Sequence, residues 1–161
     1  MKTAIIMGSD SDWPVLEPAV NLLREFGIET EVVVASAHRT PDKVHDFAAT
    51  ARERGVKVII AAAGAAAHLP GVIASYTTLP VIGVPINATP LNGVDALYSI
   101  VQMPSGIPVA SMAINGAKNA AIFAAQILAT GNAELEAKLL QQRQAMAEEV
   151  AKKAAKVSAN F

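Results

Sequence analysis

The stretch Thr3-Ala4-Ile5-Ile6-Met7-Gly8-Ser9-Asp10-Ser11-Asp12 joins a short apolar run to a glycine and a cluster of serine and aspartate residues. A helical pattern over residues 14–26 follows at once, with Asp12 as the expected N-cap and Gly27 as the expected stop. The stretch therefore predicts a buried strand, a tight polar loop and a helix, which is the repeating unit of a parallel sheet.

The same alternation continues along the chain. Apolar, β-branched runs predict strands at 3–7, 31–35, 56–61, 80–84 and 107–112, with helices at 14–26, 41–54, 69–77, 94–102 and 117–130. Thr40 is the expected N-cap of the second helix and Gly55 its stop, and Asn132 caps a long charged helix to about residue 157. We expect a single α/β domain over 1–161, with a core at about 3–130. It is a three-layer, doubly wound, flavodoxin-like parallel sheet of about five strands with an extra C-terminal helix.

The composition narrows the classes of function. Of the 161 residues, 52% are hydrophobic but only 4% are aromatic, the net charge is −1 and there is no cysteine. The small net charge gives no reason to expect nucleic acid or a membrane as a partner, and without cysteine there is neither disulfide nor thiolate chemistry. The N-terminal apolar run is too short for a signal peptide, and polar residues interrupt the alanine-rich region at 110–130. We therefore expect a cytoplasmic protein.

The helix at 117–130 is apolar on nearly every face, which is typical of a helix buried on more than one side. In a chain this short we expect its second cover to be another subunit, and hence a homo-oligomer. The last helix, with Leu135, Leu139, Met146 and Val150, could cover its own sheet or a neighbour.

The loops that leave the strands are expected to hold the chemistry, because ligands of open parallel sheets bind beyond the carboxyl ends of the strands. After the first strand, Ser9 and Ser11 face a helix N-terminus, where anions are favoured. Asp12 could cap this helix or bind a sugar hydroxyl. Helix capping alone remains the alternative for this loop.

The loop Ser36-Ala37-His38-Arg39-Thr40-Pro41 follows the second strand. Arg39 can pair with phosphate through its planar guanidinium. His38 is the best candidate for a general acid–base, because imidazole ordinarily titrates near neutrality. A histidine exposed at the surface without a function is the alternative.

The loop at 62–71 after the third strand begins with a run of minimal side chains, which lets backbone approach a small planar or anionic group. Close packing is the alternative. His68 could be catalytic or could cap and orient this loop, and we favour the second role; His45 is expected to be exposed. The loops at 85–93 and 114–119 are expected as pocket walls.

Other classes of protein fit these loops less well. A receiver domain needs an acceptor aspartate at the end of the third strand, where this chain has alanine and glycine, and a flavin carrier needs more aromatic residues than Trp13 near the loops. A dinucleotide site needs Gly-x-Gly-x-x-Gly after the first strand, and there is no ligand spacing typical of zinc. For a serine nucleophile, the sequence shows no assembled histidine and acid partner.

Several segments together resemble the N5-carboxyaminoimidazole ribonucleotide mutase family of purine biosynthesis, also called the catalytic subunit of phosphoribosylaminoimidazole carboxylase. Their order and spacing cover about residues 4 to 129. The segments are Met7-Gly8-Ser9-Asp10-Ser11-Asp12-Trp13, Ser36-Ala37-His38-Arg39-Thr40-Pro41, Ala66-Ala67-His68-Leu69-Pro70-Gly71, Pro80-Val81-Ile82-Gly83-Val84-Pro85 and Ser99-Ile100-Val101-Gln102-Met103-Pro104.

The resemblance implies a reaction and a set of roles. The family moves a carboxylate from the exocyclic nitrogen of an aminoimidazole ribonucleotide to ring carbon C4, with one histidine as proton shuttle and without metal or organic cofactor. His38 matches this histidine, and Ser9, Asp12 and Arg39 match substrate-binding positions. The loop at 62–67 would enclose CO2 as an intermediate, and the family assembles as an octamer with sites at subunit contacts. The further substrate-binding candidates are Ser11, Ser36, Ala37, Gly64, Ala66, His68 and Leu69.

The chain departs from the family pattern at Ala62 and Ala65, where glycine is usual, and in a loop after Ile114 that is about two residues shorter. Each added methyl group is expected to narrow the pocket. Two alternatives stay open: a sister group that carboxylates aminoimidazole ribonucleotide directly with free CO2, and a non-catalytic nucleotide-binding module. Residues 97–104 resemble the mutase group more closely, and the intact His38 and Arg39 argue against the second alternative.

Overall fold

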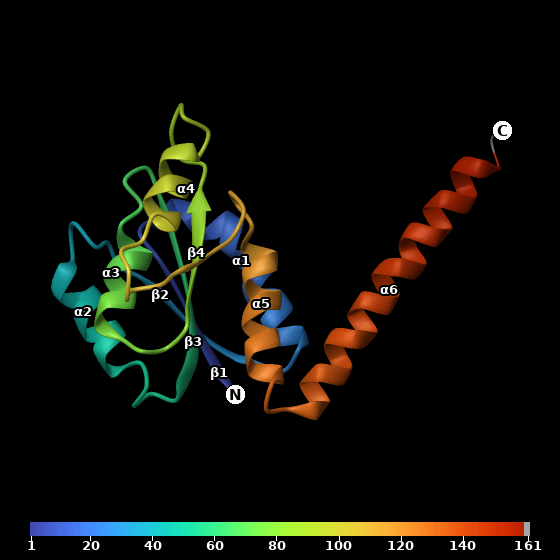
Figure 1. The fold of residues 1–161 in the computed structure, drawn as a ribbon, viewed down its shortest axis with the longest axis horizontal. Helices are drawn as coiled ribbons and strands as arrows, with labels where there is room; N and C mark the ends of the chain where they lie inside the picture. The colour runs from blue at the N-terminus through green and yellow to red at the C-terminus, as the bar shows by residue number, and fades with distance from the viewer. Residues whose placement is uncertain (160–161) are drawn as a thin grey trace.

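The structure, a computed structural model, describes residues 1–159 and contains one parallel sheet with the strand order β2-β1-β3-β4-β5 (Figure 1). The strands are β1 (Lys2–Met7), β2 (Glu29–Val34), β3 (Val56–Gly64), β4 (Val81–Ile86) and β5 (Ala110–Ser111). The helices are the 3-10 turn η1 (Asp10–Asp12), α1 (Trp13–Glu25), α2 (Pro41–Thr50), α3 (Leu69–Tyr76), α4 (Val94–Val101), α5 (Ala117–Ala129) and α6 (Ala133–Ser158). This arrangement confirms the predicted flavodoxin-like α/β fold. Residues 160–161 of the predicted domain lie outside the described residues.

Two apolar layers cover the sheet, because successive side chains of a strand point to opposite faces. Ile5 and Met7 of β1 pack in the layer with α1 and α5, whereas Ala4 and Ile6 pack in the layer with α2, α3 and α4. Figure 1 shows these two groups of helices on opposite sides of the strands. Both faces of β1 are therefore buried, which explains its unbroken apolar sequence.

Several element boundaries differ from the predicted ones. β3 runs to Gly64 rather than to residue 61, because its backbone pairs with β1 at Ala62 and with β4 at Ala63. β5 is much shorter than predicted, since it pairs only with β4 at the edge of the sheet and follows Pro108, which has no N–H to donate. The second helix ends at Thr50 rather than at residue 54, and a series of turns completes it.

The caps of the helices only partly follow the prediction. The Asn132 side chain caps α6 by accepting a hydrogen bond from the N–H three residues later, at 2.8 Å. Gly27 follows α1 with the left-handed φ of +77° that is typical of a helix end. Gly55 has a φ of +81° but ends the turns that follow α2 rather than the helix itself. Asp12 and Thr40 occupy the N-cap positions of α1 and α2, but the prediction that their side chains cap these helices is wrong. Both side chains form hydrogen bonds with earlier residues in the loops described below.

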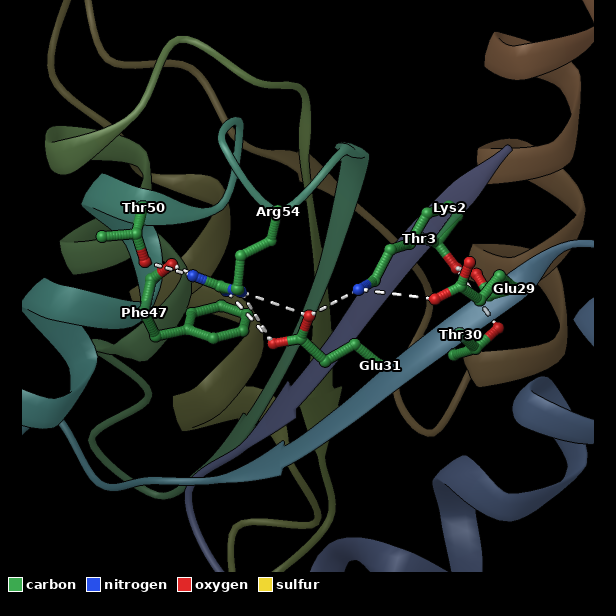
Figure 2. Close-up of polar contacts among 8 residues, drawn as sticks. All are labelled: Lys2, Thr3, Glu29, Thr30, Glu31, Phe47, Thr50 and Arg54. Atoms are coloured by element: carbon green, nitrogen blue, oxygen red, sulfur yellow. Dashed lines mark hydrogen bonds and ion pairs between the residues drawn. The ribbon is translucent and has the colours of Figure 1, made fainter.

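An ionic cluster joins β1, β2 and the end of α2 (Figure 2). The Glu31 carboxylate accepts hydrogen bonds from Arg54 at 3.2 and 3.3 Å and forms an ion pair with Lys2 at 3.2 Å. Arg54 also donates to the Thr50 hydroxyl, and Lys2 reaches Glu29 at 3.5 Å. Burial by itself would raise the pKa of Glu31, but the hydrogen bonds and positive charges of Arg54 and Lys2 outweigh it and hold this pKa below its ordinary value.

The helix α6 projects away from the rest of the fold along most of its length (Figure 1). Leu135 and Leu139 are buried with the layer of α1 and α5. Further along, Met146 and Val150 are 56% and 66% exposed. Beyond Leu139, the described part of the helix therefore has no buried residue and does not cover the rest of the fold. No helix within residues 1–159 is long and apolar enough to span a membrane.

Candidate active site

The loops after β1, β2 and β3 meet around a cavity of about 310 Å³ at the carboxyl edge of the sheet. The chain passes from β1 outward to β2 and then crosses back to β3, so the cavity lies where the strand order reverses, the usual ligand position in such sheets. Backbone hydrogen bonds hold the loops together where they begin. The Gly8 N–H donates to the Ala62 carbonyl at 3.2 Å, and the Ala35 N–H donates to the Met7 carbonyl at 3.0 Å.

The first loop closes on itself around Ser9. The Ser9 Oγ accepts hydrogen bonds from the Ser11 N–H at 3.3 Å and from the Ser11 hydroxyl at 2.9 Å. The Asp12 carboxylate turns back to accept from the Ser9 N–H at 3.2 Å, which is why it does not cap α1. Because Asp12 is only 5% exposed, burial raises the pKa of its carboxyl; the Ser9 N–H opposes this effect and the charge of Asp10 adds to it.

The second loop carries a positive charge to the cavity and links it to the first loop. The Arg39 N–H donates to the Ser36 Oγ at 3.3 Å, and the Arg39 Nη2 donates to the Gly8 carbonyl at 3.3 Å. Because a guanidinium has five N–H donors, Arg39 can hold this carbonyl and an anion together. Thr40 bonds back to Ser36 at the base of the loop and is not free to cap α2.

Two histidines meet at the cavity. The His38 Nε2 lies 2.8 Å from the His68 Nδ1, and the rings stand nearly perpendicular at 87° with their centroids 5.0 Å apart. The prediction that His68 caps its loop is wrong, since His68 takes the N-cap position of α3 without a side-chain capping bond and its ring contacts His38 instead. The site therefore contains a hydrogen-bonded pair of imidazoles rather than one isolated histidine.

The third loop approaches the cavity with almost no side chain. A Cβ on Gly64 would come within 2.6 Å of the Ala88 Cβ, so only glycine allows the loop after β4 to close over the end of β3. Ala65 follows with a left-handed φ of +54°, which is unfavourable for a residue with a Cβ. This segment therefore presents mainly backbone to the cavity.

The structure brings the predicted site residues together. Except for His68, each of them lines the cavity, and His68 is held at its edge by His38. His45 is exposed on α2 as predicted, beside Asp46. Residues 114–119, predicted as a wall, lie instead at a separate hollow beside α1, because the Asn115 N–H and side chain bond to the end of β4 and to the loop after it. Ala65 lines the cavity as expected from its departure from the family pattern, and Ala88 belongs to the loop at 85–93 that was expected as a wall. Gly8 and Ala63 also line it, although neither was among the candidate site residues.

The comparisons with known proteins agree on one family. A family model described as AIR carboxylase matches residues 2–149. The chain belongs to the AIR carboxylase family. An N5-carboxyaminoimidazole ribonucleotide mutase from Thermotoga maritima is 56% identical to the chain over 153 residues, which cover 95% of this chain and 90% of that protein. A protein of the same name from Vibrio vulnificus is 54% identical over 152 residues, covering 93% of this chain and 94% of that protein.

The fold comparison agrees with this membership of the AIR carboxylase family. The crystal structure of Treponema denticola PurE matches the chain with a TM-score of 0.86 and 29% sequence identity. The match covers 96% of this chain and 97% of that chain. Within residues 1–159, no three His, Asp or Glu side chains gather closely enough to hold a metal ion.

The two alanines that depart from the AIR carboxylase family pattern have different surroundings. Ala62 is fully buried in the layer of α1 and α5, so the expectation that its methyl group narrows the pocket is wrong. It belongs to β3, whose side chain at this position points away from the cavity and into the core. Ala65 does line the cavity, and its left-handed backbone accounts for the usual glycine of the family at this position.

Proposed function

We propose that this member of the AIR carboxylase family is an N5-carboxyaminoimidazole ribonucleotide mutase of de novo purine biosynthesis. The observation that carries the proposal is that His38 shares one cavity with Arg39, Ser9 and Asp12, the groups that such a substrate requires. Relatives of this name are more than half identical to the chain over nearly its whole length, which supports the same reaction.

The ribonucleotide binds through the first two loops. The hydroxyls of Ser9, Ser11 and Ser36 and the guanidinium of Arg39 bind the phosphate, since a planar guanidinium and the start of a helix both favour anions. The Asp12 carboxylate is fixed by the Ser9 N–H and accepts hydrogen bonds from ribose hydroxyls. The base then lies over the backbone of residues 63–66, beside Ala37 and Leu69.

His38 moves one proton in each direction. Protonated His38 gives its proton to the exocyclic nitrogen of the carbamate while the nitrogen–carboxyl bond breaks, which releases CO2 and leaves the amine. The electron pair of the enamine-like C4 then attacks the carbon of CO2. The C4 proton returns to His38, so the imidazole ends the cycle as it began it. His68 orients the ring through the 2.8 Å contact.

The small residues at the end of β3 keep the fragments together between the two steps. Gly64 and Ala66 let the backbone approach the base, and the apolar surface beside them excludes water from the released CO2. No step of this chemistry requires a metal or an organic cofactor. Treatment with EDTA is therefore expected to leave kcat/KM unchanged, and a loss that added metal restores would contradict this scheme.

The proposed function is tested by two assays of the purified protein. One assay contains the carbamate, and the other contains aminoimidazole ribonucleotide with bicarbonate. A kcat/KM much higher for the carbamate supports the mutase, whereas a higher value for the second assay supports the carboxylase that uses free CO2. If neither assay showed turnover but the protein still bound the ribonucleotide, the result would refute both enzymes and support the non-catalytic nucleotide-binding module.

The variant His38→Asn tests the proton shuttle within the same assay. We expect ribonucleotide binding to stay near normal and kcat to fall by at least about 100-fold, the usual size of a general acid–base contribution. The matched control is His45→Asn, since His45 is an exposed histidine on α2, outside the cavity. Turnover by His38→Asn within a few-fold of the wild type would refute the catalytic role of His38.

The proposal includes a cytoplasmic location and a homo-oligomer, expected to be an octamer. The exposed apolar side chains of α4 and α6 support an assembly, because such faces ordinarily pack against another surface. These side chains include Val94, Tyr98 and Val101 on α4 and Val150 on α6. The mass of the assembly by light scattering tests this part independently of the activity.

A further inference from the structure

Thr40 lies at the base of the loop that carries His38 and Arg39, and it binds Ser36 at the other end of that loop. The Thr40 Oγ1 accepts a hydrogen bond from the Ser36 N–H at 2.9 Å and donates one to the Ser36 carbonyl at 3.1 Å. The Thr40 N–H donates to the same carbonyl at 2.9 Å. Ala37, His38 and Arg39 are therefore held between two residues that one side chain fastens together.

This use of the hydroxyl differs from the one that the position of Thr40 favours. A threonine at a helix N-cap ordinarily accepts a hydrogen bond from a backbone N–H in the first turn of the helix. Here the side chain makes no such bond and is directed to Ser36. The next residue, Pro41, restricts Thr40 to a non-helical backbone, which is observed as φ −138° and ψ 56°.

A second contact fixes the same loop from the side of α2. The Lys43 Nζ donates to the Val34 carbonyl at 2.9 Å, which ties the first turn of α2 to the last residue of β2. Two side chains from the α2 side, Thr40 and Lys43, therefore bind the β2 side and hold the two ends of the short connection together. Its tip is held by the Arg39 contact with Gly8 and by the His38 contact with His68.

We propose that Thr40 is a positioning residue, whose hydroxyl fixes the geometry of the loop so that His38 and Arg39 face the substrate together. Thr40 is not among the residues that line the cavity, so it acts through the loop rather than on the substrate. The inference rests on the proposed function, because it assigns to these two residues the roles given above. A shift of the loop by about 1 Å is enough to cost up to about 100-fold in rate.

The variant Thr40→Val tests the proposal, because valine keeps the shape of the side chain and removes both hydrogen bonds of the hydroxyl. We expect kcat/KM for the carbamate to fall about tenfold or more, with an increase in KM as well as a decrease in kcat, since Arg39 and His38 are displaced together. Thr40→Ser restores the hydroxyl and is expected to return both constants to within about threefold of the wild type. The matched control is Thr130→Val, which removes a hydroxyl bound to a helix carbonyl at the exposed end of α5.

Simple destabilisation would lower only the amount of active protein, and KM would stay at the wild-type value. An unchanged KM in Thr40→Val, or a Thr40→Ser variant as impaired as Thr40→Val, would overturn the proposal. Amide hydrogen exchange at Ala37, His38 and Arg39 reports the loop without turnover, and it is expected to accelerate in Thr40→Val but not in Thr40→Ser. If the wild type turned over no carbamate, the proposed function would fail, while this exchange measurement would still decide the role of Thr40 in the loop.

Discussion

Ala65 places a methyl group in a backbone conformation that suits glycine, with φ at +54°. The left-handed region costs an L-residue roughly 1–2 kcal/mol, whereas glycine adopts it freely. Glycine at this position would remove that strain, but it also makes the unfolded chain more flexible, which lowers the free energy of unfolding by about 0.4–1 kcal/mol. We therefore expect Ala65→Gly to raise the free energy of unfolding by up to about 1 kcal/mol, as measured by urea denaturation.

The neighbouring alanine provides the control for this prediction. Ala66 also lines the cavity but is not among the residues with positive φ. Ala66→Gly is therefore expected to lower the free energy of unfolding by about 0.4–1 kcal/mol. Equal losses in the two variants would show that the backbone of Ala65 is not strained.

Asp12 is expected to serve binding at the expense of stability. Burial raises the pKa of its carboxyl, so the protonated form is favoured more in the native state than in the unfolded chain, and the ionised carboxylate opposes folding at neutral pH. Asparagine keeps an oxygen that can accept from the Ser9 N–H but carries no charge. For Asp12→Asn we expect unchanged or higher stability at pH 7, together with a KM increase of about tenfold or more from the lost charged hydrogen bonds to ribose.

The pH dependence of stability provides the check on Asp12. The stability linked to a raised carboxyl pKa is fully present below the unfolded value and is lost as the pH rises through the folded value. The wild type is thus expected to lose stability relative to Asp12→Asn as the pH rises from acid to neutral. If Asp12→Asn were less stable than the wild type at pH 7 and kept the wild-type KM, both the stability prediction and the binding prediction for Asp12 would be contradicted.

The sequence placed the site residues on the correct edge of the sheet, because loops that leave parallel strands converge there. The contact between His38 and His68 could not be predicted in the same way. Their loops follow β2 and β3, which lie on either side of β1, so the contact depends on how both loops bend over the strand between them. The Asp12 and Thr40 side chains each had two possible partners, and local pattern favours the helix cap over the earlier residue that they actually bind.

At the scale of the elements, the ionic cluster of Lys2, Glu31 and Arg54 joins β1, β2 and α2 (Figure 2). The pKa of Glu31 is lowered in the native state, so its contribution to stability is present above its unfolded value of 4.5 and is lost as the pH falls through the folded value. We expect Glu31→Gln to cost about 1 kcal/mol at pH 7, since the three side chains are only partly exposed. The difference should shrink below about pH 4.5.

Thermal denaturation of the wild type and Glu31→Gln at a series of pH values measures this contribution. The matched control is Glu149→Gln, which breaks an exposed ion pair with Lys153 within α6. This control is expected to change stability by less than about 0.5 kcal/mol. A difference between wild type and Glu31→Gln that stays constant from pH 7 to pH 3 would refute the role of the ionised carboxylate.

Element types were more predictable from the sequence than element ends. The apolar runs identify the central strands β1, β3 and β4 because both faces of these strands are covered. The end of β3 was predicted too early, since Ala62 and Ala63 have little intrinsic preference for a strand and are held in it by pairing with β1 and β4.

At the scale of the whole molecule, α6 is the element that its own chain covers least. Removal of residues 141–161 keeps Leu135 and Leu139, which are the buried residues of this helix. We therefore expect the truncated protein to remain folded by circular dichroism but to form smaller assemblies by light scattering, because exposed apolar positions such as Val150 are removed. A truncated protein with the same number of subunits as the full chain would show that α6 takes no part in assembly.

The alanine-rich contact between α5 and β3 bears on the conformational entropy of folding. Ala120, Ala121, Ala124 and Ala125 are fully buried in the same layer as Ala62 of β3. Alanine has no rotamers to lose, so burying these side chains costs almost no side-chain entropy, whereas a larger residue can cost up to about 2 kcal/mol. The packing of α5 against β3 therefore combines a close approach of the helix to the sheet with a low cost in side-chain entropy. It is also the place where larger side chains would be least tolerated, since each would lose rotamers and overpack the core at once.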